Sequence, residues 1–252
     1  MRVFITGASS GIGRSLALHY GTRGALLGLV ARRARELEDL IADLGAGTAV
    51  AYPIDVRDAA AMNEAACAFI ARCGVPDIVI ANAGVSVGTL SEGREDVDTF
   101  QTVIDVNLIG MVKTFQPFVT PMRAAASGTL VGIASVAGVR GLPGAGAYSS
   151  SKAAAINYLE SLRIELHGSG VSVVTLIPGF IDTPMTRSNP YSMPFIIGAD
   201  AAARRIARII ARAPRAAVIP WQMAIVARLL RWMPCWLYDA LAARAPRKPR
   251  QR

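Results

Sequence analysis

The chain has 252 residues, of which 52% are hydrophobic and 18% charged, and its formal net charge is +9. This composition is too apolar for a disordered chain. Three cysteines without paired C-x-x-C spacing exclude a disulfide-rich scaffold and give no indication of a structural zinc site. No apolar run reaches the roughly 18 residues of a membrane-spanning helix, and no secretion signal is visible, so we expect a cytoplasmic protein.

The positive charge is concentrated near the end of the sequence. Residues 1–200 hold 15 Lys and Arg against 17 Asp and Glu, a net charge of −2, whereas residues 201–252 hold 12 against 1, a net charge of +11. A basic segment of this kind can contact anionic lipid, an acidic partner or nucleic acid. Because no nucleic-acid-binding module is recognisable, we expect no nucleic-acid partner.

Short apolar runs alternate with longer helical patterns. Strands are predicted at 2–6, 25–31, 48–54, 77–81, 128–134, 171–177 and 216–219. Helices are predicted at 12–23, 34–44, 58–73, 97–125 (interrupted by Pro117 and Pro121), 147–167 and 199–213. The pattern predicts a single α/β domain over residues 1–220, with a Rossmann-like doubly wound parallel sheet and helices on both faces. A basic amphipathic extension follows over 221–252.

A glycine-rich turn joins the first predicted strand to the first helix, in the sequence Thr6-Gly7-Ala8-Ser9-Ser10-Gly11-Ile12-Gly13. Glycine tolerates positive φ and allows a ligand to approach the backbone closely. The free N–H groups at a helix start favour a pyrophosphate. The turn therefore predicts dinucleotide binding, although tight strand–helix turns also use glycine for purely structural reasons.

This turn is one residue longer than the common Rossmann fingerprint and resembles that of the short-chain dehydrogenase/reductase family. Further motifs of the family follow in its order and at its spacing over about residues 2–220: Asn82-Ala83-Gly84, Asn107, Ser135, Tyr148-x-x-x-Lys152 and Pro178-Gly179-x-x-x-Thr183. One departure is Ala81, where the family usually has asparagine. The resemblance implies an oxidoreductase that moves a hydride between a nicotinamide cofactor and a carbonyl or alcohol.

The residues after the second strand indicate the type of cofactor. An acidic residue there would bind the ribose 2′-hydroxyl of NAD, whereas arginine accommodates the 2′-phosphate of NADP. This chain has Arg32 and Arg33 at that point, which favours NADP(H) over NAD(H). The alternative is a solvated basic helix start. The resemblance implies Arg32 as the phosphate contact, with Arg33 and Ser9 as helpers.

The resemblance also implies which other residues bind the cofactor. Asp55 and Val56 correspond to the adenine contact, and Thr183 to the nicotinamide carboxamide contact. The complete expected set is Gly7, Ser9, Ser10, Gly11, Ile12, Gly13, Arg32, Arg33, Asp55, Val56, Asn82, Ala83, Gly84, Tyr148, Lys152, Pro178, Gly179, Ile181 and Thr183.

Four residues form the expected catalytic group: Asn107, Ser135, Tyr148 and Lys152. Tyr148 and Lys152 are four residues apart on a predicted helix and therefore share a face. A nearby ammonium and an oxidised nicotinamide both stabilise a phenolate, so we expect them to lower the pKa of Tyr148 toward neutrality, as general acid–base chemistry requires. The resemblance implies that Ser135 bonds the substrate oxygen, that Asn107 holds a water linking the lysine to solvent, and that Lys152 also bonds the nicotinamide ribose. No metal site is expected, because His19 and His167 have no accompanying ligand cluster.

The substrate side is less well defined by motifs. Residues 184–199 lack periodicity and are rich in Met, Pro and aromatic residues, and in the family this segment folds over the substrate. Its apolar content favours a lipophilic substrate, with packing on the core or on a second subunit as the alternative. Leu142 and Phe180 are candidate pocket walls. The resemblance implies a homodimer or homotetramer.

The extension over 221–252 combines apolar helical faces with arginines. Ile225, Leu229 and Trp232 share one face of a predicted helix, and Pro234 is expected to break it. Such a helix can lie in a membrane interface, with the last Arg and Lys residues, up to Arg252, facing anionic lipid. The alternative is that the apolar face caps the cleft or a subunit contact while the final residues extend into solvent.

Overall fold

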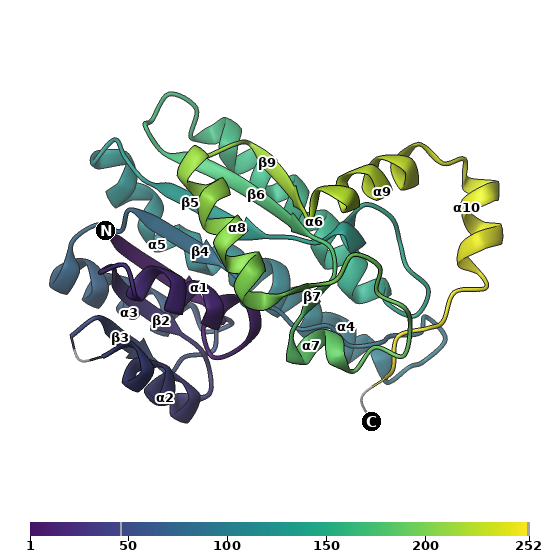
Figure 1. Cartoon of the computed structure of the whole chain (residues 1–252), viewed down its shortest axis with the longest axis horizontal. Coiled ribbons are helices and arrows are strands. Elements are labelled where there is room, and N and C mark those ends of the chain that lie inside the picture. Colours follow the sequence, from purple (N-terminus) through teal and green to yellow (C-terminus); the bar gives the residue numbers. More distant parts are fainter. Residues whose placement is uncertain (46, 251–252) are drawn as a thin grey trace.

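Seven parallel strands form the central sheet of the computed structural model, which describes residues 1–45 and 47–250 (Figure 1). Their spatial order is β3-β2-β1-β4-β5-β6-β9. The chain thus runs outward from β1 to β3, returns to place β4 beside β1, and then builds the other half. The predicted Rossmann-like α/β fold is confirmed. The strands are β1 (Arg2–Thr6), β2 (Leu26–Val30), β3 (Ala49–Tyr52), β4 (Ile78–Ala81), β5 (Thr129–Ile133), β6 (Ser172–Pro178) and β9 (Ala216–Ile219).

Helices cover both faces of this sheet. One face packs against α1 (Gly11–Gly21), α2 (Ala34–Leu44) and α8 (Ala199–Arg212), and the other against α3 (Ala59–Cys73), α5 (Gly110–Ala124) and α6 (Gly146–Glu165). α4 (Asp96–Ile104) lies beside α6. Successive residues of β1 show why its sequence is continuously apolar, since Val3 and Ile5 enter one core cluster and Phe4 enters the other.

The helix predicted over 97–125 is interrupted, but the interruption does not lie at the two prolines. Pro117 and Pro121 both lie inside α5, so the interruption expected there is wrong. The buried Phe115 and Phe118 anchor α5 to the sheet, and this packing offsets the backbone hydrogen bonds that proline removes. Between α4 and α5, a π-helical turn instead spans Asp105–Ile109. Such turns are rare and often mark functional sites.

Four short elements escaped the sequence analysis because they are too short for periodicity. β7 (Ile181–Asp182) pairs with β8 (Ile197–Gly198), and α7 (Pro184–Arg187) lies between them. A 3-10 turn, Val136–Gly138, also follows β5. The β7–β8 pair fixes both ends of the apolar segment 184–199 next to the carboxyl end of β6.

The C-terminal extension forms two helices and then returns to the body of the protein. α9 (Trp221–Trp232) ends before Pro234, as predicted, and α10 (Cys235–Ala242) follows. Met223 and Ala227 bury one face of α9 against Val136. The segment after α10 runs back toward α4 (Figure 1), so the described final residues lie against the body of the protein, although most of them are exposed. Arg252 lies outside the described residues.

Among the residues that the structure describes, none of the helices is both long and apolar enough to cross a membrane.

Candidate active site

A cleft of about 430 Å³ opens at the carboxyl ends of the parallel strands. It lies beside the neighbouring strands β1 and β4, where the order of strands along the chain reverses. Doubly wound sheets form ligand sites at this reversal of strand order. Every residue of the expected cofactor-binding and catalytic sets lines the cleft except Gly13 and Asn107, which support it from behind. Five segments far apart in the sequence therefore meet here: the glycine turn, Arg32–Arg33, Asp55–Val56, Asn82–Gly84, and the stretch from Ser135 to Thr183.

The glycine turn forms a cradle with no room for side chains. Gly7 and Gly11 have φ of +69° and +54°. A Cβ on Gly7 would lie 2.8 Å from Ala83 Cα, and one on Gly13 would lie 2.2 Å from Gly7 O. Ser10, at the start of α1, makes no capping hydrogen bond, so the first N–H groups of α1 have no side-chain cap. These features fit a dinucleotide pyrophosphate.

Asn82 joins the two strands at the reversal. Its Nδ2 donates to Thr6 O and to Gly7 O, both at 3.1 Å. Thr6 Oγ1 in turn accepts from the backbone N–H groups of Asn82 (3.2 Å) and Ala83 (3.3 Å). Asn82 thus fixes the glycine turn through backbone carbonyls, whatever residue stands at Ala81.

Two arginines lie at the rim of the cleft beside the turn. Arg33 donates to Ser9 Oγ at 2.9 Å and pairs with Glu36 at 3.1 Å. Arg32 lies 4.0 Å from Asp55, whose carboxylate pairs more closely with Arg57 at 2.8 Å. Hydrogen bonding to Arg57 lowers the pKa of Asp55 despite its partial burial. Both arginine side chains are more than half exposed. The Arg33 guanidinium and the Ser9 hydroxyl lie next to each other in the lining of the cleft.

Ser135, Tyr148 and Lys152 meet at the inner end of the cleft. Lys152 is buried, its Nζ donates to Ile133 O at 2.7 Å, and it lies 5.8 Å from the centroid of the Tyr148 ring. Burial lowers the pKa of Lys152 to about 8. Ser135 Oγ accepts from Ala137 N at 3.1 Å, which orients the hydroxyl at the end of β5.

The fall in the pKa of Tyr148 that was expected from Lys152 is not found in the structure, where the pKa of the phenol is raised instead. Burial raises the pKa of the phenol, and this effect exceeds the opposing hydrogen-bond effect of Ser135. The phenol is therefore held protonated, which is the state of a proton donor.

Asn107 is fully buried in the π-helical turn and braces the cleft wall. Its Oδ1 accepts from Val85 N at 2.8 Å, and its Nδ2 donates to Val85 O at 3.0 Å and to Ser151 Oγ at 2.9 Å. A Cβ on Gly84 would lie 3.3 Å from Asn107 Oδ1 and 3.7 Å from Lys152 Nζ. Asn107 thus lies behind Gly84, near Lys152, and its side chain holds the loop after β4 at Val85.

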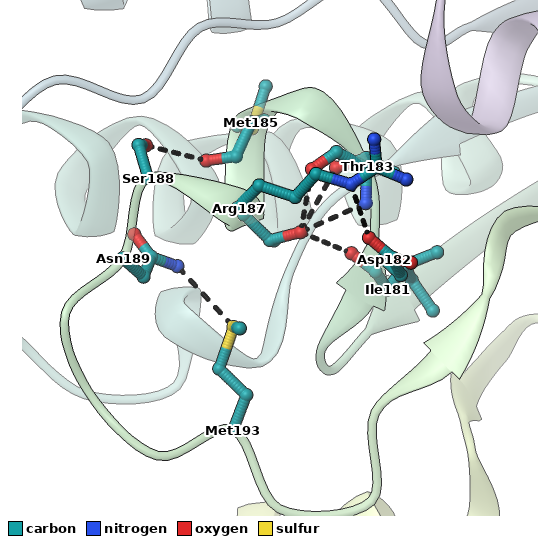
Figure 2. A network of polar contacts seen from close by, with 9 residues as sticks. Ile181, Asp182, Thr183, Met185, Arg187, Ser188, Asn189 and Met193 are labelled. Carbon is teal, nitrogen blue, oxygen red and sulfur yellow. Dashed lines mark hydrogen bonds and ion pairs between the residues drawn. The ribbon is translucent and has the colours of Figure 1, made fainter.

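The segment after β7 carries a network of polar contacts, which Figure 2 shows. Thr183 N donates to Thr186 Oγ1 at 3.0 Å, and Thr186 Oγ1 donates to Ile181 O at 2.6 Å. Arg187 pairs with Asp182 at 2.8 Å. This network orients Thr183. Pro184, Met185 and Thr186 line the cleft and belong to the segment 184–199 that was expected to fold over the substrate.

The two candidate pocket walls lie elsewhere. Leu142 lines a second hollow, together with Leu90, Phe100 and Arg247. Phe180 does not line the cleft and packs edge-on against Tyr191, with 6.5 Å between ring centroids. Both assignments rested on position in the sequence alone, which does not fix side-chain direction.

One basic residue near the catalytic group was not predicted. Lys248 Nζ lies 5.6 Å from the centroid of the Tyr148 ring and donates to Ser86 Oγ at 2.6 Å. Its sequence neighbourhood is a run of basic residues, which gave no indication of a buried position.

Within residues 1–45 and 47–250, no cluster of His, Cys, Asp and Glu is arranged to hold a metal ion.

Comparison with known proteins gives a consistent result. The family model described as short chain dehydrogenase matches residues 1–192. An uncharacterized oxidoreductase of Myxococcus xanthus (strain DK1622) is 38% identical over 242 residues, which is 95% of each chain. The 2-dehydro-3-deoxy-L-rhamnonate dehydrogenase (NAD(+)) of Sphingomonas sp. (strain SKA58) is 37% identical over 188 residues, which is 75% of each chain.

Solved structures with the same fold include an alcohol dehydrogenase from the archaeon Thermococcus sibiricus, complexed with 5-hydroxy-NADP. It is 28% identical, has a TM-score of 0.76, and the match covers 86% of this chain and 95% of that one. The Sphingomonas relative is named for NAD(+) and the archaeal enzyme holds an NADP derivative, so the cofactor preference has to be argued from the residues of this chain.

Proposed function

This chain belongs to the short-chain dehydrogenase/reductase family and is an oxidoreductase, and we propose that it interconverts a carbonyl and an alcohol with NADP(H), using Tyr148 as general acid and base. The observation that carries the proposal is the convergence of Ser135, Tyr148 and Lys152 at the inner end of a cleft whose outer end is a glycine cradle. One end of the cleft suits a dinucleotide and the other suits proton transfer.

The nicotinamide, when bound, supplies or accepts the hydride. In the reductive direction, Tyr148 donates its proton to the substrate oxygen, and the Ser135 hydroxyl donates a hydrogen bond to the same oxygen as charge develops there. In the oxidative direction, Tyr148 accepts the hydroxyl proton. Lys152 presents its ammonium beside the phenol, and Asn107 holds the wall that positions it.

The preference for NADP(H) rests on the rim of the cleft. Arg32, Arg33 and Ser9 offer several donors to a 2′-phosphate, and Arg33 already donates to Ser9. Two guanidinium groups favour a phosphate by charge-assisted hydrogen bonds. The acids near the rim are already paired with arginines: Asp55 accepts from Arg57, and Glu36 pairs with Arg33.

The proposal is tested with purified protein, NADPH and a series of ketones and aldehydes, by following NADPH oxidation. Tyr148→Phe should lower kcat by roughly 10²- to 10⁴-fold, the usual contribution of general acid–base catalysis. Tyr158→Phe is the matched control, because Tyr158 lies on the same helix but does not line the cleft. Full turnover in Tyr148→Phe would assign the role of the acid to another residue, whereas no turnover in wild type would leave the protein as a cofactor-binding scaffold.

The substrate is proposed to have an apolar part. Met185 lines the cleft, and segment 184–199 also exposes Phe195 and Ile196. In the same assay, kcat/KM should rise with the chain length of the carbonyl compound, because each buried CH₂ contributes about 0.8 kcal/mol. Higher kcat/KM with short polar carbonyls would assign these residues to packing.

A membrane-peripheral form of the same enzyme is favoured by the outer face of α9. Trp221, Ile225, Leu229 and Trp232 are 53–78% exposed, and Arg228 and Arg231 lie on the same helix. Apolar side chains beside arginines suit an anionic membrane surface. We therefore propose that α9 can bind such a surface from the cytoplasm.

Binding to vesicles with anionic lipid tests this point. Leu229→Ser combined with Trp232→Ser should abolish sedimentation with vesicles, whereas Ile164→Ser, a control at another exposed apolar position, should not. If wild type does not sediment, and the double variant instead lowers the mass measured by light scattering, the face is the contact of the homodimer or homotetramer that we propose for this family member.

A further inference from the structure

The segment after α10 is held at several points against the loops that follow β4 and β5. Pro249 O accepts from Gly88 N at 3.0 Å, and Arg250 pairs with Asp96 at 2.9 Å and also with Glu95. At Gly144, an added Cβ would meet Arg247 Cβ at 2.9 Å. We call residues 244–250 the strap. Its contacts join the loop after β4 to the loop after β5, the two loops that flank Tyr148.

The strap carries one side chain inward. Lys248 is half-buried, donates to Ser86 and lies beside the Tyr148 ring, whereas its neighbours Arg247 and Pro249 are exposed. Gly88 leaves space for the strap backbone, because a Cβ there would lie 2.4 Å from Lys248 O. The position of the lysine is therefore determined by backbone contacts on both sides of it.

The ammonium of Lys248 has no acidic partner among the residues that the structure describes; the carboxylates near the strap, Glu95 and Asp96, pair with Arg250. A lysine ammonium has three donors, and a Ser86 hydroxyl satisfies one of them. Burial lowers the pKa of Lys248 to about 8. A partly desolvated cation of this kind is stabilised when an anion binds to it.

On the basis of the proposed oxidoreductase function, we propose that Lys248 is a specificity-determining residue that binds a carboxylate of the substrate. The substrate is then a hydroxy acid or the corresponding oxo acid. Because the Tyr148 phenol exchanges its proton with the reacting oxygen, and Lys248 lies against the same ring, the carboxylate is separated from the reacting carbon by only a few bonds. The apolar part of the substrate extends from the other side of that carbon.

The test compares acids with their neutral esters. Wild type, Lys248→Met, Lys248→Arg and Arg247→Met are assayed for oxidation of 2- and 3-hydroxy acids of four to eight carbons and of their methyl esters, with NADP⁺ and with NAD⁺. Lys248→Met should lower kcat/KM for the preferred acid by about 10- to 100-fold, mainly through KM, because the ion pair forms in both ground and transition states. Its effect on the ester should be under about threefold.

The other variants separate charge from structure. Lys248→Arg should keep most of the preference for the acid, and Arg247→Met should behave as wild type, because Arg247 is exposed and carries the same charge on the same strap. Equal activity of wild type on acid and ester would overturn the assignment, as would equal losses on both in Lys248→Met. A gain on all substrates in Lys248→Met would also overturn it and make the strap a plug of the cleft.

The result also distinguishes this inference from the proposed function. If wild type oxidises neither acids nor esters nor simple alcohols with either cofactor, the oxidoreductase assignment of the site fails first. If it turns over neutral alcohols but does not favour acids, only the role of Lys248 fails.

Discussion

At the scale of single residues, the cleft depends on a few side chains whose partners come from distant segments. Asn82 holds the glycine turn, and Asn107 holds the strand end at Val85. Lys152 is buried with one backbone acceptor, Ile133 O. Buried polar groups are costly unless hydrogen-bonded, so each of these contacts also restricts the backbone around the cleft. The two rim arginines differ, since they are exposed and available to a ligand.

Cofactor choice is a residue-scale prediction. Arg33→Ser and Arg32→Ser should each lower kcat/KM with NADPH by about 10- to 100-fold, the value of a charge-assisted hydrogen bond, and leave NADH little affected. The measurement is kcat/KM for both cofactors at one fixed carbonyl substrate. Arg35→Ser is the control, because Arg35 is exposed on α2 and does not line the cleft. An unchanged NADPH/NADH ratio in both rim variants would show that the phosphate is bound elsewhere.

At the scale of elements, the glycine turn and α1 act as one unit. Gly13 lies within the first turn of α1, and its lack of a side chain allows the helix start to approach the Gly7 carbonyl and the Asn82 amide. The same close packing positions the first N–H groups of α1 toward the cleft. The π-helical turn has a comparable role between α4 and α5, where it places Asn107 toward Val85 and Ser151.

Gly13→Ala should therefore destabilise the fold and weaken cofactor binding together. The added Cβ would lie 2.2 Å from Gly7 O and 2.6 Å from Asn82 Nδ2, so the backbone of the turn has to move. Overpacking of this kind costs about 1–3 kcal/mol. Urea unfolding gives the stability, and NADPH titration by fluorescence gives the Kd. Gly141→Ala, where the added Cβ meets nothing within 4 Å, should stay within about 0.5 kcal/mol of wild type in urea.

At the scale of the whole molecule, two lysines that are about 100 residues apart in the sequence, the buried Lys152 and the half-buried Lys248, approach one tyrosine. Lys152 comes from α6 and Lys248 from the strap, and burial lowers the pKa of each to about 8. Both ammonium groups are desolvated only when the protein is folded. Their protonation is therefore linked to global stability.

The free energy of unfolding of the ligand-free protein should rise with pH between about 8 and the unfolded lysine value of about 10.4. In that range the unfolded chain binds more protons than the folded one, so each lysine adds up to about 1.4 kcal/mol per pH unit. Below pH 8 both states are protonated and this contribution is flat. Urea unfolding from pH 7 to 10 measures it, and a rise of the same size in the Lys152→Met, Lys248→Met double variant would contradict the linkage.

Much of the fold and of the cleft could be predicted from the sequence because the signals involved are local. Strands buried on both faces are continuously apolar, helices show their periodicity, and the glycine turn and the Tyr148-x-x-x-Lys152 spacing lie within one or two elements. Pro117 and Pro121 misled the prediction, since α5 is stabilised by Phe115 and Phe118 packing on the sheet, a contact that propensity does not report.

The sequence by itself determined the doubly wound sheet, the family and the residues that come together in the cleft. Only the tertiary structure decided that burial raises the pKa of Tyr148, that Leu142 and Phe180 lie outside the cleft, and that the strap brings Lys248 to the tyrosine. Desolvation depends on everything packed around a group, and a contact between residues 100 positions apart depends on the path of the chain. Neither quantity is encoded in local spacing, whereas strand burial and helix periodicity are.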